Sequence, residues 1–229
     1  KGSRKYGGRT LNYKQYRFGT SFFGRIINWA EFQAQTIRLS KDIDIIHSFV
    51  FWPEIHYFLN KLNKPIIFRQ GNPPSKNDFK RIIKSNPYQG HLQCISKNQL
   101  SKIDINDSTK TFVTYNCVDT KKFKSIKGSE RKYLAYLGRL NYDKGIDIAI
   151  KLAIDSGLNL KIAGPVRKLE PNANKLFHEK VKPLLGESIQ YVGELNDLEK
   201  INFLSNAIAL LVPNRWDEPF GITNIEALA

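Results

Sequence analysis

Residues 189–229 read IQYVGELNDLEKINFLSNAIALLVPNRWDEPFGITNIEALA, and this stretch decides the fold. It contains two short apolar runs of β type, Ile189–Val192 and Ile208–Val212, joined by the helix-like segment Asp197–Asn206. The apolar runs are continuous rather than alternating, as in strands that are buried on both faces of a parallel sheet. The stretch therefore predicts a strand, a crossover helix and a second, parallel strand.

The same alternation of apolar runs and helical patterns extends back to Lys41 and predicts an α/β fold with parallel sheets. The other predicted strands are Ile43–Phe49, Pro65–Arg69, His91–Ile95, Thr111–Tyr115, Tyr133–Leu137 and Leu158–Ala163. The predicted apolar helix faces are Trp29, Phe32 and Ile37 in residues 21–39, Ile146, Ile150, Ala153 and Ile154 in residues 145–156, and Leu198, Ile201 and Leu204 after an N-cap at Asp197.

Two glutamates flank a glycine turn near the end of the quoted stretch. Glu218 precedes Pro-Phe-Gly, and Glu226 lies about one turn into a helix that is predicted to begin near Gly221. The glycine lets a diphosphate approach the backbone, and the free N–H groups at a helix start favour negative charge. The two carboxylates can then accept hydrogen bonds from sugar hydroxyls. The alternative is an ordinary helix start at which Glu218 is only a favourable charge.

A second candidate element, GRLNYDKG, follows the predicted strand that ends at Leu137. Its two cations, Arg139 and Lys144, lie on a glycine-bounded loop after a parallel strand, where they can converge on a diphosphate at the carboxyl edge of the sheet. Taken alone, Lys-Gly before a helix is also a common surface feature. The same layout of strand and glycine recurs at Gly164 and Gly193. Together these elements predict a pocket for a nucleotide sugar.

From about Tyr133 to Ala229 the chain resembles the C-terminal domain of glycosyltransferase family 4. GRLNYDKG is similar to the donor-phosphate loop of that family, LKIAG to its next strand, and the quoted stretch to its closing motif throughout. In the first half the resemblance is looser and rests on IDIIHSF, PIIFRQG, CISKNQ and YNCVDTKKF. The resemblance implies the GT-B fold, in which two Rossmann-like parallel-sheet domains face a cleft. We expect an acceptor-side domain over 1–128 and a donor-binding domain over 129–229, both incomplete in this chain.

The resemblance further implies a retaining hexosyltransferase that uses a nucleoside-diphosphate sugar, with no cofactor and no required metal. Its catalytic residues would be Arg139 and Lys144, which hold the diphosphate and neutralise charge on the leaving group, and Glu218, which contacts the donor sugar. Thr223 would bind the phosphate, Glu226 the ribose, and backbone near Leu195 the base. The expected substrate-binding residues are Gly138, Gly193, Leu195, Phe220, Gly221, Ile222, Thr223, Glu226 and Gln70. No further carboxylate pair resembles a nucleophile and acid dyad, so a double-displacement glycosidase mechanism is not expected.

Two positions depart from the family pattern. Where the family usually has His-Gly after its corresponding strand, this chain reads Gln70-Gly71. A glutamine can keep a hydrogen bond to a donor sugar but cannot take a titratable role. Cys117 stands where the family usually has the glycine of Asn-Gly-Val-Asp, and cysteine disfavours positive φ, so the turn is expected to be altered. Four histidines without ligand spacing predict no metal site.

The charge of the chain is unevenly distributed. There are 36 Lys and Arg against 21 Asp and Glu, a net charge of +15, of which residues 1–130 carry +14. This predicts an anionic partner for the first half, although a basic surface that serves solubility is the alternative. The expected partners are a nucleotide-sugar donor, an anionic or lipid-linked glycan acceptor and, peripherally, an anionic membrane, but no nucleic acid.

The opening and the predicted linker are the least regular parts of the sequence. Lys1–Arg25 has seven Lys or Arg, no acid and several interleaved aromatics, which suits a membrane interface or a nucleic-acid backbone. An edge strand over Arg9–Phe18 with a lysine-decorated face fits equally well. Residues 121–132, KKFKSIKGSERK, are interpreted as a domain linker. The absence of methionine and the apolar run at the end lead us to expect a piece of a longer protein.

Three functions are therefore weighed. The favoured one is a family 4 glycosyltransferase of cell-surface glycan or glycolipid synthesis, cytoplasmic or peripheral on the cytoplasmic membrane face. A GT-B sugar-nucleotide epimerase would not be expected to carry EPFG…E beside GRL…KG. A non-catalytic basic module that binds nucleic acid would explain the charge but would leave the second half without a purpose.

Overall fold

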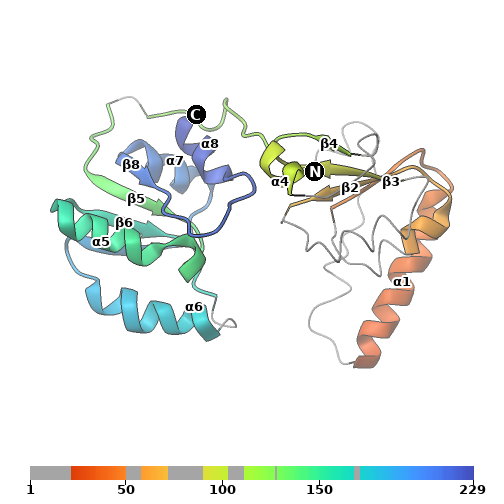
Figure 1. Cartoon of the computed structure of the whole chain (residues 1–229), viewed down its shortest axis with the longest axis horizontal. Coiled ribbons are helices and arrows are strands. Elements are labelled where there is room, and N and C mark those ends of the chain that lie inside the picture. Colours follow the sequence, from red (N-terminus) through yellow and green to blue (C-terminus); the bar gives the residue numbers. More distant parts are fainter. Residues whose placement is uncertain (1–21, 50–57, 72–89, 103–110, 127, 168–170) are drawn as a thin grey trace. The chain divides into compact units, whose positions relative to one another are not determined.

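The computed structural model describes residues 22–49, 58–71, 90–102, 111–126, 128–167 and 171–229 (Figure 1). The chain divides into two compact units, Lys1–Tyr115 and Asn116–Ala229, and each contains its own four-stranded sheet. No helix within the described ranges combines the length and the apolar character needed to cross a membrane. The predicted edge strand over Arg9–Phe18 and the rest of the basic opening up to residue 21 lie outside these ranges.

The boundary between the units falls before the segment that the sequence suggested as a linker. Lys122 donates from Nζ to Asp197 Oδ2 at 2.5 Å, and the buried Phe123 ring lies 5.1 Å from Lys200 Nζ. The backbone N–H of Ile126 donates to a serine hydroxyl in the same unit. These contacts explain why residues 116–128 group with the second unit rather than with the first.

The first unit is built on a parallel sheet with the strand order β1-β2-β3-β4. Its elements are α1 Phe22–Ser40, β1 Ile46–Ser48, a 3₁₀ turn at Asn60–Leu62, β2 Ile66–Gln70, β3 Gly90–Cys94, α4 Lys97–Ser101 and β4 Thr111–Val113. All four strands predicted for this half are present, each displaced by at most a few residues at its ends.

Helix α1 provides one side of the core of this unit. Phe32 is buried and packs with Ile66 and Leu92 from the sheet, and its ring stacks on Trp29 at 5.5 Å. The predicted core position of Ile37 is wrong, because its side chain is 46% exposed. At 100° per residue, five positions place Ile37 about 140° around the helix from Phe32.

The second unit is also a parallel sheet, with the order β7-β6-β5-β8. Its elements are β5 Tyr133–Leu137, a 3₁₀ turn at Tyr142–Lys144, α5 Ile146–Ser156, β6 Leu160–Ala163, α6 Pro171–Leu176, a π-helical turn at Phe177–Val181, a 3₁₀ turn at Lys182–Leu184, β7 Ile189–Gly193, α7 Asp197–Ser205, β8 Ala207–Leu211 and α8 Ile222–Leu228. The four predicted strands and the helices predicted over 145–156, over 197–206 and after Gly221 are confirmed.

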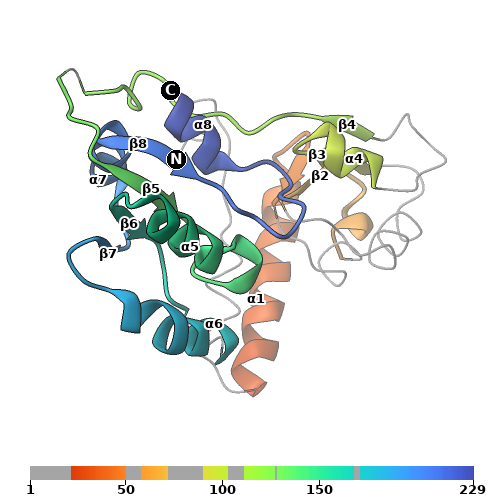
Figure 2. The ribbon, with the colours of Figure 1, turned by 60° about the vertical axis from the view of Figure 1, so that its left-hand side comes forward.

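Alternate residues of the central strand β5 serve two different cores. Leu134 and Tyr136 pack with the buried face of α5, whereas Tyr133 and Ala135 pack with Phe203 of α7. Figures 1 and 2 show α5 and α6 on one side of the sheet and α7 on the other. The sheet is therefore covered on both faces, as its continuous apolar strands predicted.

Three details of the helix predictions are wrong. Asn196, not Asp197, is the N-cap of α7: Asn196 Oδ1 accepts from the N–H groups of Leu198 and Glu199, and Glu199 returns a hydrogen bond to the backbone of Asn196. Leu198 is 75% exposed, because Phe203 takes the buried position on α7. On α5, Ile154 is exposed and Ala149 is buried in its place.

Candidate active site

Loops that follow the four strands of the second unit meet at the carboxyl edge of its sheet. Gly138 N donates to Ala163 O at 3.0 Å, and Gly164 N donates to Gly193 O at 2.8 Å, so the ends of β5, β6 and β7 are held together. Gly164 has a φ of +134°, and a Cβ there would lie 1.9 Å from Gly138 O. Only glycine fits this close approach of two backbones.

The loop with the sequence GRLNYDKG is held by hydrogen bonds from the strand before it and between its own residues. The Tyr136 hydroxyl donates to Arg139 O at 2.9 Å, and Asn141 Oδ1 accepts from Lys144 N at 3.1 Å. Burial raises the pKa of Tyr136, and the nearby Asp147 carboxylate raises it further, so the hydroxyl keeps its proton. Arg139 forms no ion pair with any residue that the structure describes, which leaves its guanidinium available.

Lys144 and Glu218 come together from the loops after β5 and β8. Lys144 Nζ bonds Glu218 Oε2, and the two side chains are only 17% and 25% exposed. The same oxygen accepts from Trp216 Nε1 at 3.1 Å and from Asn214 Nδ2 at 3.3 Å. Among the described residues nothing donates to the other oxygen, Oε1. The carboxylate is thus fixed on one side and open on the other.

Arg215 connects the two loops that carry this pair. Its guanidinium donates to both carboxylate oxygens of Asp147 at 2.7 and 2.6 Å and to Tyr142 O at 2.9 Å. It also lies 4.0 Å from the centre of the Tyr142 ring. The hydrogen bond from Arg215 holds the pKa of Asp147 below its usual value. The fork geometry fixes the segment after β8 against the start of α5.

Glu226 has a lysine partner of its own. Lys200 Nζ lies 2.5 Å from Glu226 Oε1 and 3.2 Å from Asp197 Oδ1, and the Glu226 side chain is only 8% exposed. Burial lowers the pKa of Lys200, but the two carboxylates outweigh it, and the net shift is upward. Lys200 is therefore charged at neutral pH.

The remaining predicted residues are distributed as follows. Phe220 and Gly221 directly precede α8, and Ile222 and Thr223 open it. Gly193 ends β7, and Leu195 lies just beyond. Gln70 ends β2 in the first unit, and its side chain is outside the described part of the chain. The structure thus brings two of the predicted residues, Lys144 and Glu218, into contact. Glu226 instead pairs with Lys200, which was not predicted. The roles assigned to all these residues stay predictions. Across the described ranges, no three His, Cys, Asp or Glu side chains are grouped as metal ligands would be.

Sequence reasoning missed five residues that support this region. Asn214, Arg215 and Trp216 stand within the quoted stretch directly before Glu218, and their proximity to that glutamate was the available signal. Asp147 and Lys200 gave none, because a charged residue on an otherwise ordinary helix has the same pattern whether it is paired or solvated.

Comparison with known proteins agrees with this arrangement. Residues 118–229 match the family described as Glycosyl transferases group 1. An uncharacterized 42.6 kDa protein in the cps region of Klebsiella pneumoniae is 28% identical over 122 residues, which is 53% of this chain and 30% of that protein.

Solved structures resemble the chain over more of its length. Sucrose-phosphate synthase from Thermosynechococcus elongatus has a TM-score of 0.71 at 13% identity, over 96% of this chain and 60% of its own. A glycosyltransferase from Rickettsia africae has a TM-score of 0.64 at 18% identity, over 96% of this chain and 62% of its own. A glycosyltransferase involved in avilamycin A biosynthesis has a TM-score of 0.58 at 19% identity, over 85% of this chain and 56% of its own. In each case the match spans less than two thirds of the other protein. The chain therefore has an α/β fold with two parallel sheets that matches the structures of GT-B glycosyltransferases, and its second unit is similar in sequence to the glycosyl transferases group 1 family.

Proposed function

We propose that the chain is part of a retaining, family 4 type glycosyltransferase that takes a hexose from a nucleoside-diphosphate sugar, and that its second unit binds this donor. The observation that carries the proposal is the contact of Lys144 with Glu218 next to the Arg139 loop, at the carboxyl edge of a parallel sheet. Ligands of open α/β sheets bind outside this edge. A cation for phosphate and a carboxylate for sugar hydroxyls are the two chemistries that a nucleotide sugar requires side by side.

The diphosphate would be bound by the two cations of the loop. Arg139 has no carboxylate partner among the described residues, and Lys144 has three N–H donors, of which Glu218 takes one. As the bond to the sugar breaks, negative charge grows on the leaving diphosphate. Cations already in position stabilise that charge without reorganising, and this is how the loop would accelerate the transfer.

The two glutamates would bind the sugars on either side of the phosphates. Glu218 is oriented by three donors on Oε2, and its Oε1 can accept from a hydroxyl of the donor sugar. Glu226, oriented by Lys200, would accept from the ribose hydroxyls. Thr223 and the backbone of Phe220, Gly221 and Ile222 would complete the phosphate and sugar contacts.

The acceptor is proposed from charge and from the curated relative. The first 130 residues carry +14, which favours an anionic or lipid-linked glycan and a peripheral position on the cytoplasmic membrane face. The relative from a cps region supports a role in capsule-type polysaccharide synthesis.

The test is a panel of nucleoside diphosphates, namely UDP, GDP, ADP, CDP and dTDP, in thermal unfolding of the full chain with and without magnesium. A ligand at one hundred times its dissociation constant stabilises the folded state by about 2.7 kcal/mol, which raises the unfolding midpoint by several degrees. We expect at least one diphosphate to do so without magnesium. No stabilisation by any of the five would contradict the proposal.

Variants then test the assigned residues with the donor that the panel selects. Arg139→Ala and Lys144→Ala should each lower turnover by about 10²–10³, as expected for the loss of one preorganised electrostatic group. Lys151→Ala is the matched control, because it removes a lysine that is 75% exposed on α5 and whose ion pair, within the described ranges, is with Asp155 of the same helix. Wild-type turnover in both loop variants would show that the pocket is misplaced. The anomeric configuration of the product, followed by NMR, tests retention.

A further inference from the structure

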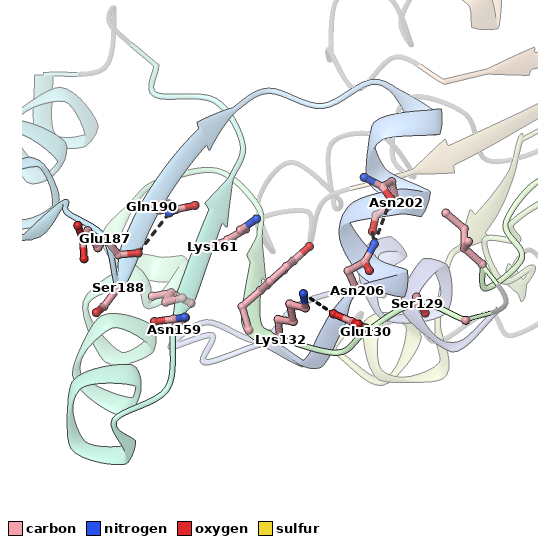
Figure 3. A pocket seen from close by; sticks show the side chains of 14 residues that line it. Ser129, Glu130, Lys132, Asn159, Lys161, Glu187, Ser188, Gln190, Asn202 and Asn206 are labelled. Atoms are coloured by element: carbon pink, nitrogen blue, oxygen red, sulfur yellow. Dashed lines mark hydrogen bonds and ion pairs between the residues drawn. The ribbon is translucent and has the colours of Figure 1, made fainter.

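A hollow lies at the amino edge of the sheet in the second unit, where the strands begin and opposite the edge that carries the candidate active site (Figure 3). Its volume is about 660 Å³, within the range of small-molecule sites. It is lined from the starts of β5, β6 and β7, from the end of α7 and from the segment before β5. Because the candidate active site is at the carboxyl edge, the two sites share no residues.

Neutral hydrogen-bonding side chains dominate the lining of this hollow. Figure 3 shows Gln190 and Ser188 on one side and Asn202 and Asn206 on the other. Each amide offers donors and an acceptor together, which matches hydroxyls, since these also donate and accept. Apart from Tyr133, whose hydroxyl donates to Phe203 O, the neutral polar side chains are Ser129, Asn159, Ser188, Gln190, Asn202 and Asn206.

Three of these side chains, Gln190, Asn202 and Asn206, are oriented by hydrogen bonds within the protein. Asn206 Nδ2 donates to Asn202 Oδ1 at 3.0 Å, and Gln190 Nε2 donates to Glu187 O at 3.2 Å. The backbone beneath them is tied by Lys132 N to Asn206 O at 3.0 Å. A ligand would therefore order little of the protein on binding.

The charges of the hollow balance, although the chain as a whole is strongly basic. Its charged lining consists of two lysines and two glutamates. Lys132 pairs with Glu130, and Lys161 Nζ lies 4.5 Å from the centre of the Tyr133 ring. An anionic ligand would meet as many carboxylates as ammonium groups, so the lining favours an uncharged, hydroxyl-rich one.

We propose that this hollow binds a neutral oligosaccharide, a stretch of glycan held away from the point of transfer. The choice of a glycan among hydroxyl-rich ligands rests on the proposed glycosyltransferase function. The polar, charge-balanced lining is an observation that holds independently of that function.

The experiment uses maltohexaose, cellohexaose and α-1,6-mannohexaose as probes, with a sulfated hexasaccharide as the anionic comparison. Binding to the full chain is measured by saturation-transfer NMR and calorimetry. The test variant is the double substitution Gln190→Ala and Asn202→Ala, and Asn172→Ala, an exposed amide on α6, is the matched control. We expect at least one neutral hexasaccharide to bind to the wild-type chain and, with equal affinity, to the control variant. Its binding to the double variant should be weaker by roughly tenfold or more.

Three results would overturn the proposal: no binding of any neutral probe, equal binding by wild type and the double variant, or tighter binding of the sulfated probe that the double substitution weakens. Stabilisation by nucleoside diphosphates is measured on the same samples. Glycan binding that depends on Gln190 and Asn202 without any diphosphate binding would refute the proposed function and leave this inference standing. Diphosphate binding without glycan binding would support the proposed function and refute this inference.

Discussion

Two glycines at the ends of α5 allow a matched test of the contact between the loops after β5 and β8, which carry Lys144 and Glu218. Gly145 precedes the helix with φ +67°, and Gly157 follows it with φ +66°. An alanine in this left-handed region costs about 1–2 kcal/mol at either position. A Cβ at residue 157 would meet nothing within 4 Å, whereas one at residue 145 would lie 2.0 Å from Pro213 O. The two substitutions share the backbone strain and differ only in the clash.

The clash sets the expected difference. Ordinary Cβ contacts begin near 3.4 Å, so Gly145→Ala must open the loops by roughly 1.4 Å. Overpacking of this kind typically costs about 1–3 kcal/mol more. We therefore expect Gly145→Ala to destabilise the protein by about 2–5 kcal/mol and Gly157→Ala by about 1–2 kcal/mol. Thermal unfolding of the two variants side by side measures the difference.

The same opening separates Lys144 from the segment that carries Glu218. A displacement of about 1 Å in a catalytic site can cost 10²-fold in rate. Turnover should therefore fall about a hundredfold in Gly145→Ala and stay near wild type in Gly157→Ala, at a temperature where both are folded. If the two variants lose the same stability and both keep wild-type turnover, the contact between these loops does not position the site.

Four further outcomes are expected. The destabilising effects of Arg215→Ala and Asp147→Ala on thermal unfolding should not add, because each substitution removes the same ion pair. The pKa of Asp147 is lowered in the folded state, so this coupling should be present above about pH 4 and vanish as the pH falls below it; strict additivity at pH 7 would contradict the bond. Lys200→Met leaves the buried Glu226 without its cation and should cost about 2–3 kcal/mol; unchanged unfolding would contradict the pair. Glu218→Gln should tighten nucleoside diphosphate binding in calorimetry, because the neighbouring ammonium loses its competing carboxylate, but should lower turnover; weaker diphosphate binding would oppose this. The basic half should make the chain sediment with anionic vesicles at low salt and less at high salt, and equal partitioning to neutral vesicles would exclude an electrostatic membrane contact.

The strands could be predicted because their signal is local. A strand such as β5, which is covered on both faces, must be apolar at nearly every position. The short, continuously apolar run Tyr133–Leu137 has this pattern and therefore indicates a buried strand. Helix faces were harder, because several apolar residues compete for one stripe. On α7 the choice between Leu198 and Phe203 depends on which side meets the sheet, and spacing alone does not decide that.

The candidate site could be predicted only to the level of its two loops. Lys144 and Glu218 were identified from motifs, but their contact depends on β8 lying beside β5, a feature of the strand order rather than of either motif. The bond from Arg215 to Asp147 joins residues 68 positions apart, and neither has a local pattern that marks it. The partner of a charged side chain is set by tertiary structure, so the sequence predicts the charge but not the pair.

Pairing explains how a nearly neutral half could present a cation to the proposed diphosphate. Residues 131–229 carry only +1, and their cations near the site are matched one by one: Lys144 with Glu218, Lys200 with Glu226, Arg215 with Asp147. Arg139 is the exception among the described residues of this edge, so its field is not cancelled at short range. Net charge is thus informative for the first half, where the proposed steering of an acceptor would act over distance. In the second half, the guanidinium of Arg139, which has no ion-pair partner among the described residues, matters more for the proposed donor site than the summed charge does.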